Sequence, residues 1–144
     1  WYDSTLFAFV ADHNHATYKN HALESFEHHR IPMLIYGEPL KDSLRGKTFD
    51  EICGNTDLPA MILAQLGQTH EEFFWSKNIF GKCYKPFAFF ELSNGLGWKT
   101  PEGEFVYSNT GVFIKNNLPN TYGDSIVLDG KAYMQYHVDL FNSY

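Results

Sequence analysis

Two short apolar runs in the first quarter of the chain lack the alternation of a half-exposed strand. Residues 5–11 read TLFAFVA and residues 31–36 read IPMLIY, and neither run contains a charged side chain. An uninterrupted apolar run of this length, bounded by polar segments, is typical of a strand buried on both faces of a parallel sheet. We therefore expect two buried parallel strands, which need neighbouring strands and helices that this sequence hardly supplies.

Helices are predicted at two places in the first half. The polar, histidine-rich segment 12–29 connects the two apolar runs and contains a short helical stretch, ALESFEHH. Residues 55–67 have the clearest helical pattern. Thr56 or Asp57 can cap the N-terminus of this helix, Pro59 suits its first turn, and a glycine follows its last turn.

From residue 86 onward the pattern changes to short strands. The stretches PFAFFELS, LGWKT, EFVYS and GVFIKN are separated by turn residues and predict an antiparallel meander. Residues 130–141 then predict an amphipathic helix, with an apolar face made of Tyr133, Tyr136, His137, Leu140 and Phe141. The predicted fold class is α/β, with buried strands, a small antiparallel sheet and a terminal helix.

Composition and charge narrow the classes of function. The chain has 144 residues, of which 44% are hydrophobic, enough for the core of one domain. The net charge of −6 argues against a nucleic-acid partner, because such a surface needs a basic stripe. An anionic substrate is still compatible, because a bound metal supplies local positive charge. Cys53 and Cys83 form neither a CxxC motif nor a disulfide framework.

The first apolar run ends at Asp12 and His13, which are the strongest candidates for chemistry. The carboxyl edge of a parallel sheet is where α/β proteins bind ligands. A carboxylate and an imidazole suit a divalent metal, and Asn14 favours a turn that lets both side chains meet one site. In the alternative interpretation, Asp12 caps a turn and His13 is solvated. A catalytic metal site needs about three protein ligands, and the nearby polar residues are more typical of a solvated connection: His15, His21, Glu24, Glu27, His28 and His29.

Other catalytic patterns are absent from the sequence. There is no G-x-S-x-G nucleophile elbow, and there is no G-x-x-x-x-G-K-[ST] or G-x-G-x-x-G phosphate loop. The stretch THEEFFW lacks the second histidine of the H-E-x-x-H zinc motif, so we expect His70 to lie in a loop after the helix.

Five stretches, in their order and at their distances, resemble the C-terminal part of sulfatase-like enzymes. The nearer resemblance is to the lipoteichoic acid synthase and phosphoglycerol transferase branch of the alkaline phosphatase superfamily. In that family a strand ends in Asp-His, Arg-Ile-Pro enters the next strand, and an acid opens a helix that ends at glycine. The match runs over nearly the whole chain, and the five stretches read TLFAFVADHNH, RIPMLIYG, TDLPAMILAQLG, WSKNIFG and PFAFFELSNGLGWKTPEGEFVYS.

The resemblance implies that the chain is the C-terminal fragment of an alkaline-phosphatase-like domain. Residues 1–85 would be the C-terminal half of its α/β core, and residues 86–144 its small sheet and terminal helix. The family's nucleophile is a threonine, serine or modified cysteine in the N-terminal half, which this chain lacks. Neither cysteine lies in a C-x-P-x-R pattern. The resemblance therefore places no catalytic nucleophile in this chain, and its expected partner is the missing N-terminal half of the same domain.

The resemblance also implies a metal site and a substrate class. Asp12 and His13 match the family's Asp-His ligands of a divalent metal, which would be manganese, zinc, calcium or magnesium. His15 and Lys19 would lie near the anionic sulfate or phosphate ester, and Asp57 matches the acid that opens a structural helix. The parent enzyme would hydrolyse or transfer such esters on the extracytoplasmic face of the cell membrane, and the fragment alone would be inactive.

A second class of function stays open on the sequence. The chain is rich in aromatic residues, and a non-catalytic module would bind carbohydrate or another protein through the aromatic side chains of its second half. The residues expected to do so are Trp75, Trp98 and Tyr107. A metal-dependent change in melting temperature that requires Asp12 and His13 would favour the hydrolase interpretation over the module.

Overall fold

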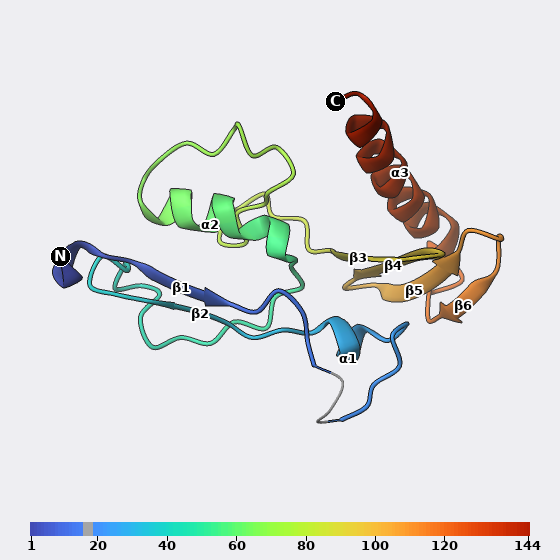
Figure 1. Ribbon diagram of the computed structural model, residues 1–144, viewed down its shortest axis with the longest axis horizontal. Helices are drawn as coiled ribbons and strands as arrows, with labels where there is room; N and C mark the ends of the chain where they lie inside the picture. The colour runs from blue at the N-terminus through green and yellow to red at the C-terminus, as the bar shows by residue number, and fades with distance from the viewer. Residues whose placement is uncertain (16–18) are drawn as a thin grey trace.

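The structure, a computed structural model, describes residues 1–15 and 19–144 and has a mixed α/β fold (Figure 1). Strands β1 and β2 form a two-stranded sheet, and strands β3 to β6 form a four-stranded antiparallel sheet in chain order. This confirms the predicted α/β class with a small antiparallel sheet and a terminal helix. The elements are η1 (Tyr2–Ser4), β1 (Phe7–Val10), α1 (Phe26–His29), β2 (Met33–Tyr36), η2 (Asn55–Asp57), α2 (Leu58–Gln65), β3 (Ala88–Leu92), β4 (Gly95–Thr100), β5 (Gly103–Ser108), β6 (Phe113–Asn116) and α3 (Gly123–Asn142).

One face of the four-stranded sheet packs against α3. Side chains on successive strand residues alternate between faces, and this alternation directs Leu96, Trp98 and Phe105 toward the helix, where they form a buried cluster with Ile126 and Val127. Gly130 lets the helix approach closely, because a Cβ atom there would lie 2.8 Å from Cζ of Phe105. The main core of the chain therefore lies between this sheet and α3.

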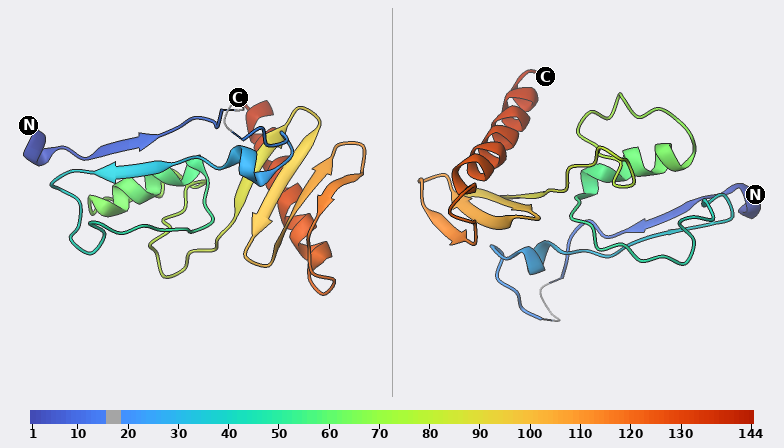
Figure 2. Two further views of the ribbon diagram at one scale, coloured as in Figure 1. Left: turned by 90° about the horizontal axis from the view of Figure 1, so that it is seen from below. Right: turned by 180° about the vertical axis from the view of Figure 1, so that it is seen from behind.

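The opposite face of the same sheet is covered by α1 (Figures 1 and 2). Phe26 meets the ring of Phe90 edge-on at 4.9 Å, and His29 stacks on that ring at 3.7 Å. Gly97, on the neighbouring strand, leaves the space that the Phe90 ring occupies. A four-residue helix from the first half thus completes the core of the second half.

The prediction that residues 5–11 and 31–36 form parallel strands buried on both faces is wrong. Strands β1 and β2 pair antiparallel, with Phe7 opposite Tyr36, and Phe9 and Leu34 are 57% and 58% exposed. A parallel pair requires a crossover that packs on the sheet, usually a helix. In the described part of the connection, α1 is the only helix or strand, and α1 packs on the other sheet.

The predicted helix at 55–67 is confirmed as η2 followed by α2, which lies alongside the β1–β2 ribbon (Figure 1). The terminal helix is confirmed but begins at Gly123, earlier than predicted. Its predicted apolar face is only partly buried: Tyr133 packs against the core cluster, whereas Phe141 is exposed. The helix is longer than the sheet is wide, so its last turns project beyond the sheet (Figure 1). Among the helices of the described residues, none is long and apolar enough to cross a bilayer.

Candidate functional site

Asp12 and His13 lie in a bend directly after β1. The backbone N–H of His13 donates to Oδ1 of Asp12 at 2.9 Å. The Nδ1 atom of the His13 ring lies 2.8 Å from the backbone carbonyl oxygen of Asn14. Because a carbonyl oxygen only accepts hydrogen bonds, Nδ1 is the protonated nitrogen in this contact, and in the neutral ring Nε2 keeps its lone pair. This is the arrangement by which proteins orient metal-binding histidines.

The two potential ligand atoms lie close together. Oδ1 of Asp12 is 3.7 Å from Nε2 of His13, and two ligands of a tetrahedral zinc lie roughly 3.4 Å apart when each is about 2.0–2.1 Å from the metal. The side chains are 89% and 74% exposed, so the pair is open to solvent. The separation of the two atoms is therefore close to that of two adjacent ligands of one divalent ion.

The turn also has the features of the alternative interpretation, in which Asp12 caps a turn and His13 is solvated. The carboxylate of Asp12 accepts a backbone hydrogen bond within its own bend, and with a protonated His13 the pair is an exposed ion pair, which contributes little to stability. In residues 1–15 and 19–144, no group of three His, Cys, Asp or Glu side chains converges on a point that could hold a metal. Asp12 and His13 are thus two candidate ligands, fewer than the about three that a catalytic metal site needs.

The structure brings Asp12 and His13 together, and the two predicted substrate residues, His15 and Lys19, follow them along the chain. His15 is exposed two residues after the pair, and its backbone N–H donates to Oδ1 of Asn14 at 2.8 Å. Lys19 is exposed beyond residues 16–18, which lie outside the described residues. The bend itself is tied to α1, because Nδ2 of Asn14 donates to the carbonyl of Glu27 at 3.4 Å.

A buried carboxylate organises the N-terminus of α2. Asp57 is fully buried and accepts the backbone N–H of Gly54 at 3.0 Å and that of Lys77 at 2.9 Å. The ammonium group of Lys77 lies 2.8 Å from the same carboxylate and 3.6 Å from the centre of the Phe87 ring. Burial is tolerated because each charge of the pair is matched and hydrogen-bonded. Asp57 therefore joins η2 to the segment that leads into β3.

Ser76 makes a second connection between the same two segments. Its hydroxyl accepts the backbone N–H of Ala60 at 2.8 Å, which satisfies one of the free N–H groups in the first turn of α2. The sequence suggested Thr56 or Asp57 for this cap. Neither makes a side-chain cap hydrogen bond to this helix, and the residue that does comes from 16 positions farther along the chain.

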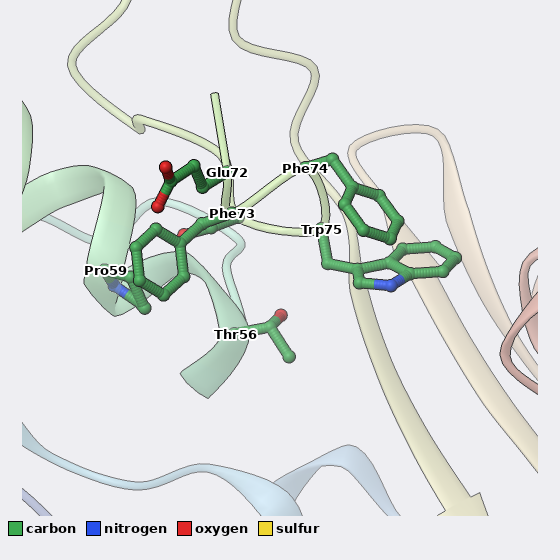
Figure 3. Close-up of a pocket in the computed structure, with 7 residues that line it drawn as sticks. Thr56, Pro59, Glu72, Phe73, Phe74 and Trp75 are labelled. Atoms are coloured by element: carbon green, nitrogen blue, oxygen red, sulfur yellow. The ribbon is translucent and has the colours of Figure 1, made fainter. Parts of the chain in front are cut away.

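A pocket of about 270 Å³ opens between the start of α2 and the segment 72–76 (Figure 3). Phe73 and Pro59 lie on one side of it and Phe74 and Trp75 on the other, with Thr56 between them (Figure 3). Its walls are mostly apolar, and Thr56, Glu72 and Ser76 are the polar residues among those that line it. The pocket is concave and mostly apolar with few polar groups, which is the usual character of small-molecule sites.

Behind the pocket, Trp75 packs against α3 through a cluster of rings. Its ring centre lies 3.9 Å from that of His137, and His137 lies 4.4 Å from Tyr133 and 6.0 Å from Phe89. Within the part of the chain that the structure describes, Nε2 of His137 has no hydrogen-bond partner. Burial among these rings lowers the pKa of His137, and the carboxylate of Glu91 partly offsets that effect.

Lowering the pH from 7.5 to 5 is expected to destabilise the chain through His137. A histidine with a lowered folded-state pKa contributes its full stability above the unfolded-state pKa of about 6.5, and that stability is lost as the pH falls toward the folded-state value. The melting temperature should drop by about 2–4 °C for each kcal/mol lost. The drop should be smaller in His137→Phe, which keeps the ring but does not titrate.

Thermal melts of the wild type and of His137→Phe across this pH range measure the difference. His29 adds a drop of the same sign in both proteins, because burial also lowers its pKa. His13→Gln, which removes an exposed imidazole, is the control and should keep the full drop. Equal drops in the wild type and in His137→Phe would contradict the prediction.

The aromatic residues expected to bind a ligand differ in their surroundings. Trp98 is buried in the core beneath α3, where it stacks on Phe87 at 4.4 Å. Tyr107 is half-buried, and the ammonium of Lys131 lies 3.8 Å from the centre of its ring. The prediction that Trp98 offers a binding surface is therefore wrong, that for Tyr107 stays a prediction, and Trp75 lines a pocket.

The two cysteines have different environments. Cys53 is half-buried and Cys83 is exposed, and both are free thiols. Burial and the nearby Asp57 carboxylate raise the pKa of the Cys53 thiol. A raised pKa keeps a thiol protonated and unreactive, so Cys53 is a packing residue.

Sequence reasoning missed the partners that position the α2 N-terminus and the pocket. Asp57 was expected only as the acid that opens a helix, and Lys77 and Ser76 were not singled out, because their partners lie 16 to 20 residues away. The phenylalanines of the stretch FFW carried a usable signal, since adjacent aromatic residues in a predicted loop are unusual surface residues. No protein-family model, curated protein or solved structure matches the chain.

Proposed function

We propose that this chain is the C-terminal part of a sulfatase-like, metal-dependent enzyme that hydrolyses or transfers sulfate or phosphate esters, including phosphoglycerol esters. The observation that carries the proposal is the Asp12–His13 bend, where a carboxylate oxygen and an oriented imidazole nitrogen lie 3.7 Å apart in the open. The order of the sequence stretches supports it further. The reaction would take place on the extracytoplasmic face of the membrane, as in the enzymes that the sequence resembles.

In this proposal the chain contributes metal ligands and no nucleophile. Asp12 and His13 hold a divalent ion, with manganese, zinc, calcium and magnesium as the candidates, and Asn14 keeps the His13 ring oriented through its carbonyl oxygen. A bound ion supplies Lewis acidity, which neutralises charge on the ester and lowers the pKa of the attacking group. The remaining ligands and a threonine, serine or modified cysteine nucleophile come from the preceding half of the same domain.

A manganese titration tests the two proposed ligands directly. Mn²⁺ is added to the isotope-labelled chain, and the paramagnetic broadening of each amide resonance is followed by NMR. Broadening should be strongest at residues 11–14. Removing a ligand should weaken it at least tenfold, since loss of even a supporting residue commonly costs 10- to 100-fold in metal affinity. The ligand variants are Asp12→Asn and His13→Gln, which preserve side-chain shape.

The matched control is Asp50→Ala. Asp50 is another exposed carboxylate, with its Oδ1 atom 3.2 Å from the guanidinium of Arg30. Its removal should leave the broadening at residues 11–14 unchanged. Broadening spread evenly over all acidic residues, or unaltered in the double variant Asp12→Asn, His13→Gln, would overturn the proposal and favour a simple solvated turn.

A further inference from the structure

The pocket beside α2 has walls that are fixed before any ligand arrives. Its floor, at the junction of η2 and α2, is tied to its outer wall by two hydrogen bonds: Ser76 accepts from Ala60 at 2.8 Å, and Lys77 donates to Asp57 at 2.9 Å. The Lys77–Asp57 ion pair reinforces the second of these contacts. Binding to such a preorganised site loses little free energy to ordering of the protein.

The aromatic side chains of the wall are also held in place. Trp75 packs against three rings of α3, those of Tyr133 at 5.1 Å, Tyr136 at 4.9 Å and His137 at 3.9 Å. The ring of Phe74 lies 5.1 Å from it. Phe74 and Phe73 remain substantially exposed although they line the pocket. Neighbouring exposed aromatic rings beside a rigid wall form an apolar patch, and such patches commonly mark binding sites.

The size and chemistry of the pocket restrict its ligand. A volume of about 270 Å³ admits one small ring and is near the lower end of ligand pockets, which begin at about 300 Å³. Opposed apolar walls suit a flat, weakly polar face, and the hydroxyl of Thr56 between them suits a hydroxyl group at a ring edge (Figure 3). A pyranose ring has both an apolar C–H face and a hydroxyl edge. We infer that this pocket binds the ring of a neutral glycoside.

Other ligand classes fit less well. An anionic group would find no cationic side chain among the residues that line the pocket, and the ammonium of Lys77, the residue after Ser76, is already paired with Asp57. A lipid chain exceeds the volume. A quaternary ammonium needs several free ring faces around it, and Trp75 already uses its ring against Tyr133, Tyr136 and His137.

This inference is independent of the proposed ester chemistry, because it involves neither Asp12 nor His13. The chain either binds glycosides at the pocket or does not, whatever the manganese titration shows. If both hold, the pocket would receive a sugar unit of the substrate or acceptor of the parent enzyme. If only the pocket binds, the chain acts as a carbohydrate-binding module.

Saturation-transfer NMR with the methyl glycosides of glucose, galactose, mannose and N-acetylglucosamine tests the inference on the full chain. At least one glycoside should bind saturably, with a Kd on the order of 1–10 mM, the range for one small ring with few contacts. Phe74→Ser should weaken binding about fivefold or more. Because Phe74 is 61% exposed, its replacement should not unfold the chain, and Thr56→Val tests the polar side of the pocket independently.

Phe113→Ser on β6 is the matched control, because Phe113 is another exposed phenylalanine outside the pocket. It should bind glycosides as the wild type does. Failure of all four glycosides to bind at 50 mM, equal binding by the wild type, Phe74→Ser and Thr56→Val, or tighter binding of tetramethylammonium than of any glycoside would each overturn the inference.

Discussion

Asp57→Ala is expected to lower the free energy of unfolding by about 3–5 kcal/mol, the usual cost of removing one partner of a buried ion pair. The substitution leaves the ammonium of Lys77, 19% exposed, without its counter-ion. It also removes the acceptor for the backbone N–H groups of Gly54 and Lys77. Equilibrium urea unfolding, followed by tryptophan fluorescence, measures the change, since Trp75 lies two residues from Lys77.

Asp57→Asn separates the charge from the hydrogen bonds. An amide side chain keeps one oxygen for a backbone N–H but cannot neutralise Lys77. The free energy of unfolding of Asp57→Asn should therefore lie between that of the wild type and that of Asp57→Ala. Adding Lys77→Met to Asp57→Ala should recover part of the loss, because the buried charge disappears with its partner. An Asp57→Ala chain that unfolds at the wild-type urea concentration would show that this carboxylate does not hold the two segments together.

The parts of the fold that the sequence predicted well are those specified by neighbouring residues. The helix at 55–67 follows from a proline in its first turn and a glycine after its last one, both of which act within a few positions. The four-stranded sheet follows from two-residue connections such as Pro101–Glu102, which leave adjacent strands little choice but to pair antiparallel. Interactions between residues close in the sequence therefore determine most of the strands and turns of the second half.

The orientation of β1 and β2 could not be predicted in the same way. Their apolar runs indicate burial in any sheet, but the choice between parallel and antiparallel pairing depends on where the connection packs. Phe26 and His29 of that connection pack on Phe90, which lies 64 and 61 positions farther along the chain. The exposed side chains of Phe9 and Leu34 show that the apolar pattern of this ribbon exceeds what the described residues bury.

The candidate site was predictable only as a pair. Adjacent residues in a turn can be recognised in one stretch of sequence, and Asp12 and His13 do approach each other after β1. The pocket beside α2 combines Thr56 and Pro59 with Phe73 and Phe74, and its two walls are joined by hydrogen bonds between residues 16 and 20 positions apart. No spacing rule connects such residues, so the pocket became visible only in the folded chain.

Phe105→Ala is expected to cost about 3–5 kcal/mol, the usual range for truncating a buried phenylalanine. Phe105 is 0% exposed and lies in the cluster between the sheet and α3, with Gly130 of the helix directly above its ring. Alanine would leave a cavity that the rigid backbones on either side cannot close. The melting temperature should fall by roughly 10 °C, at about 2–4 °C per kcal/mol for a domain of this size.

Phe113→Ala provides the comparison, because the two rings touch each other. Phe105 and Phe113 meet edge-on at 6.1 Å, but Phe113 is 40% exposed at the edge of the sheet. Loss of the ring contact alone costs about 0.5–1.5 kcal/mol, so Phe113→Ala should lower the melting temperature by only a few degrees. If the two variants have the same melting temperature, the ring pair rather than the buried core stabilises the sheet. If Phe105→Ala alone melts early, the packing of α3 on β4 and β5 is what holds the second half together.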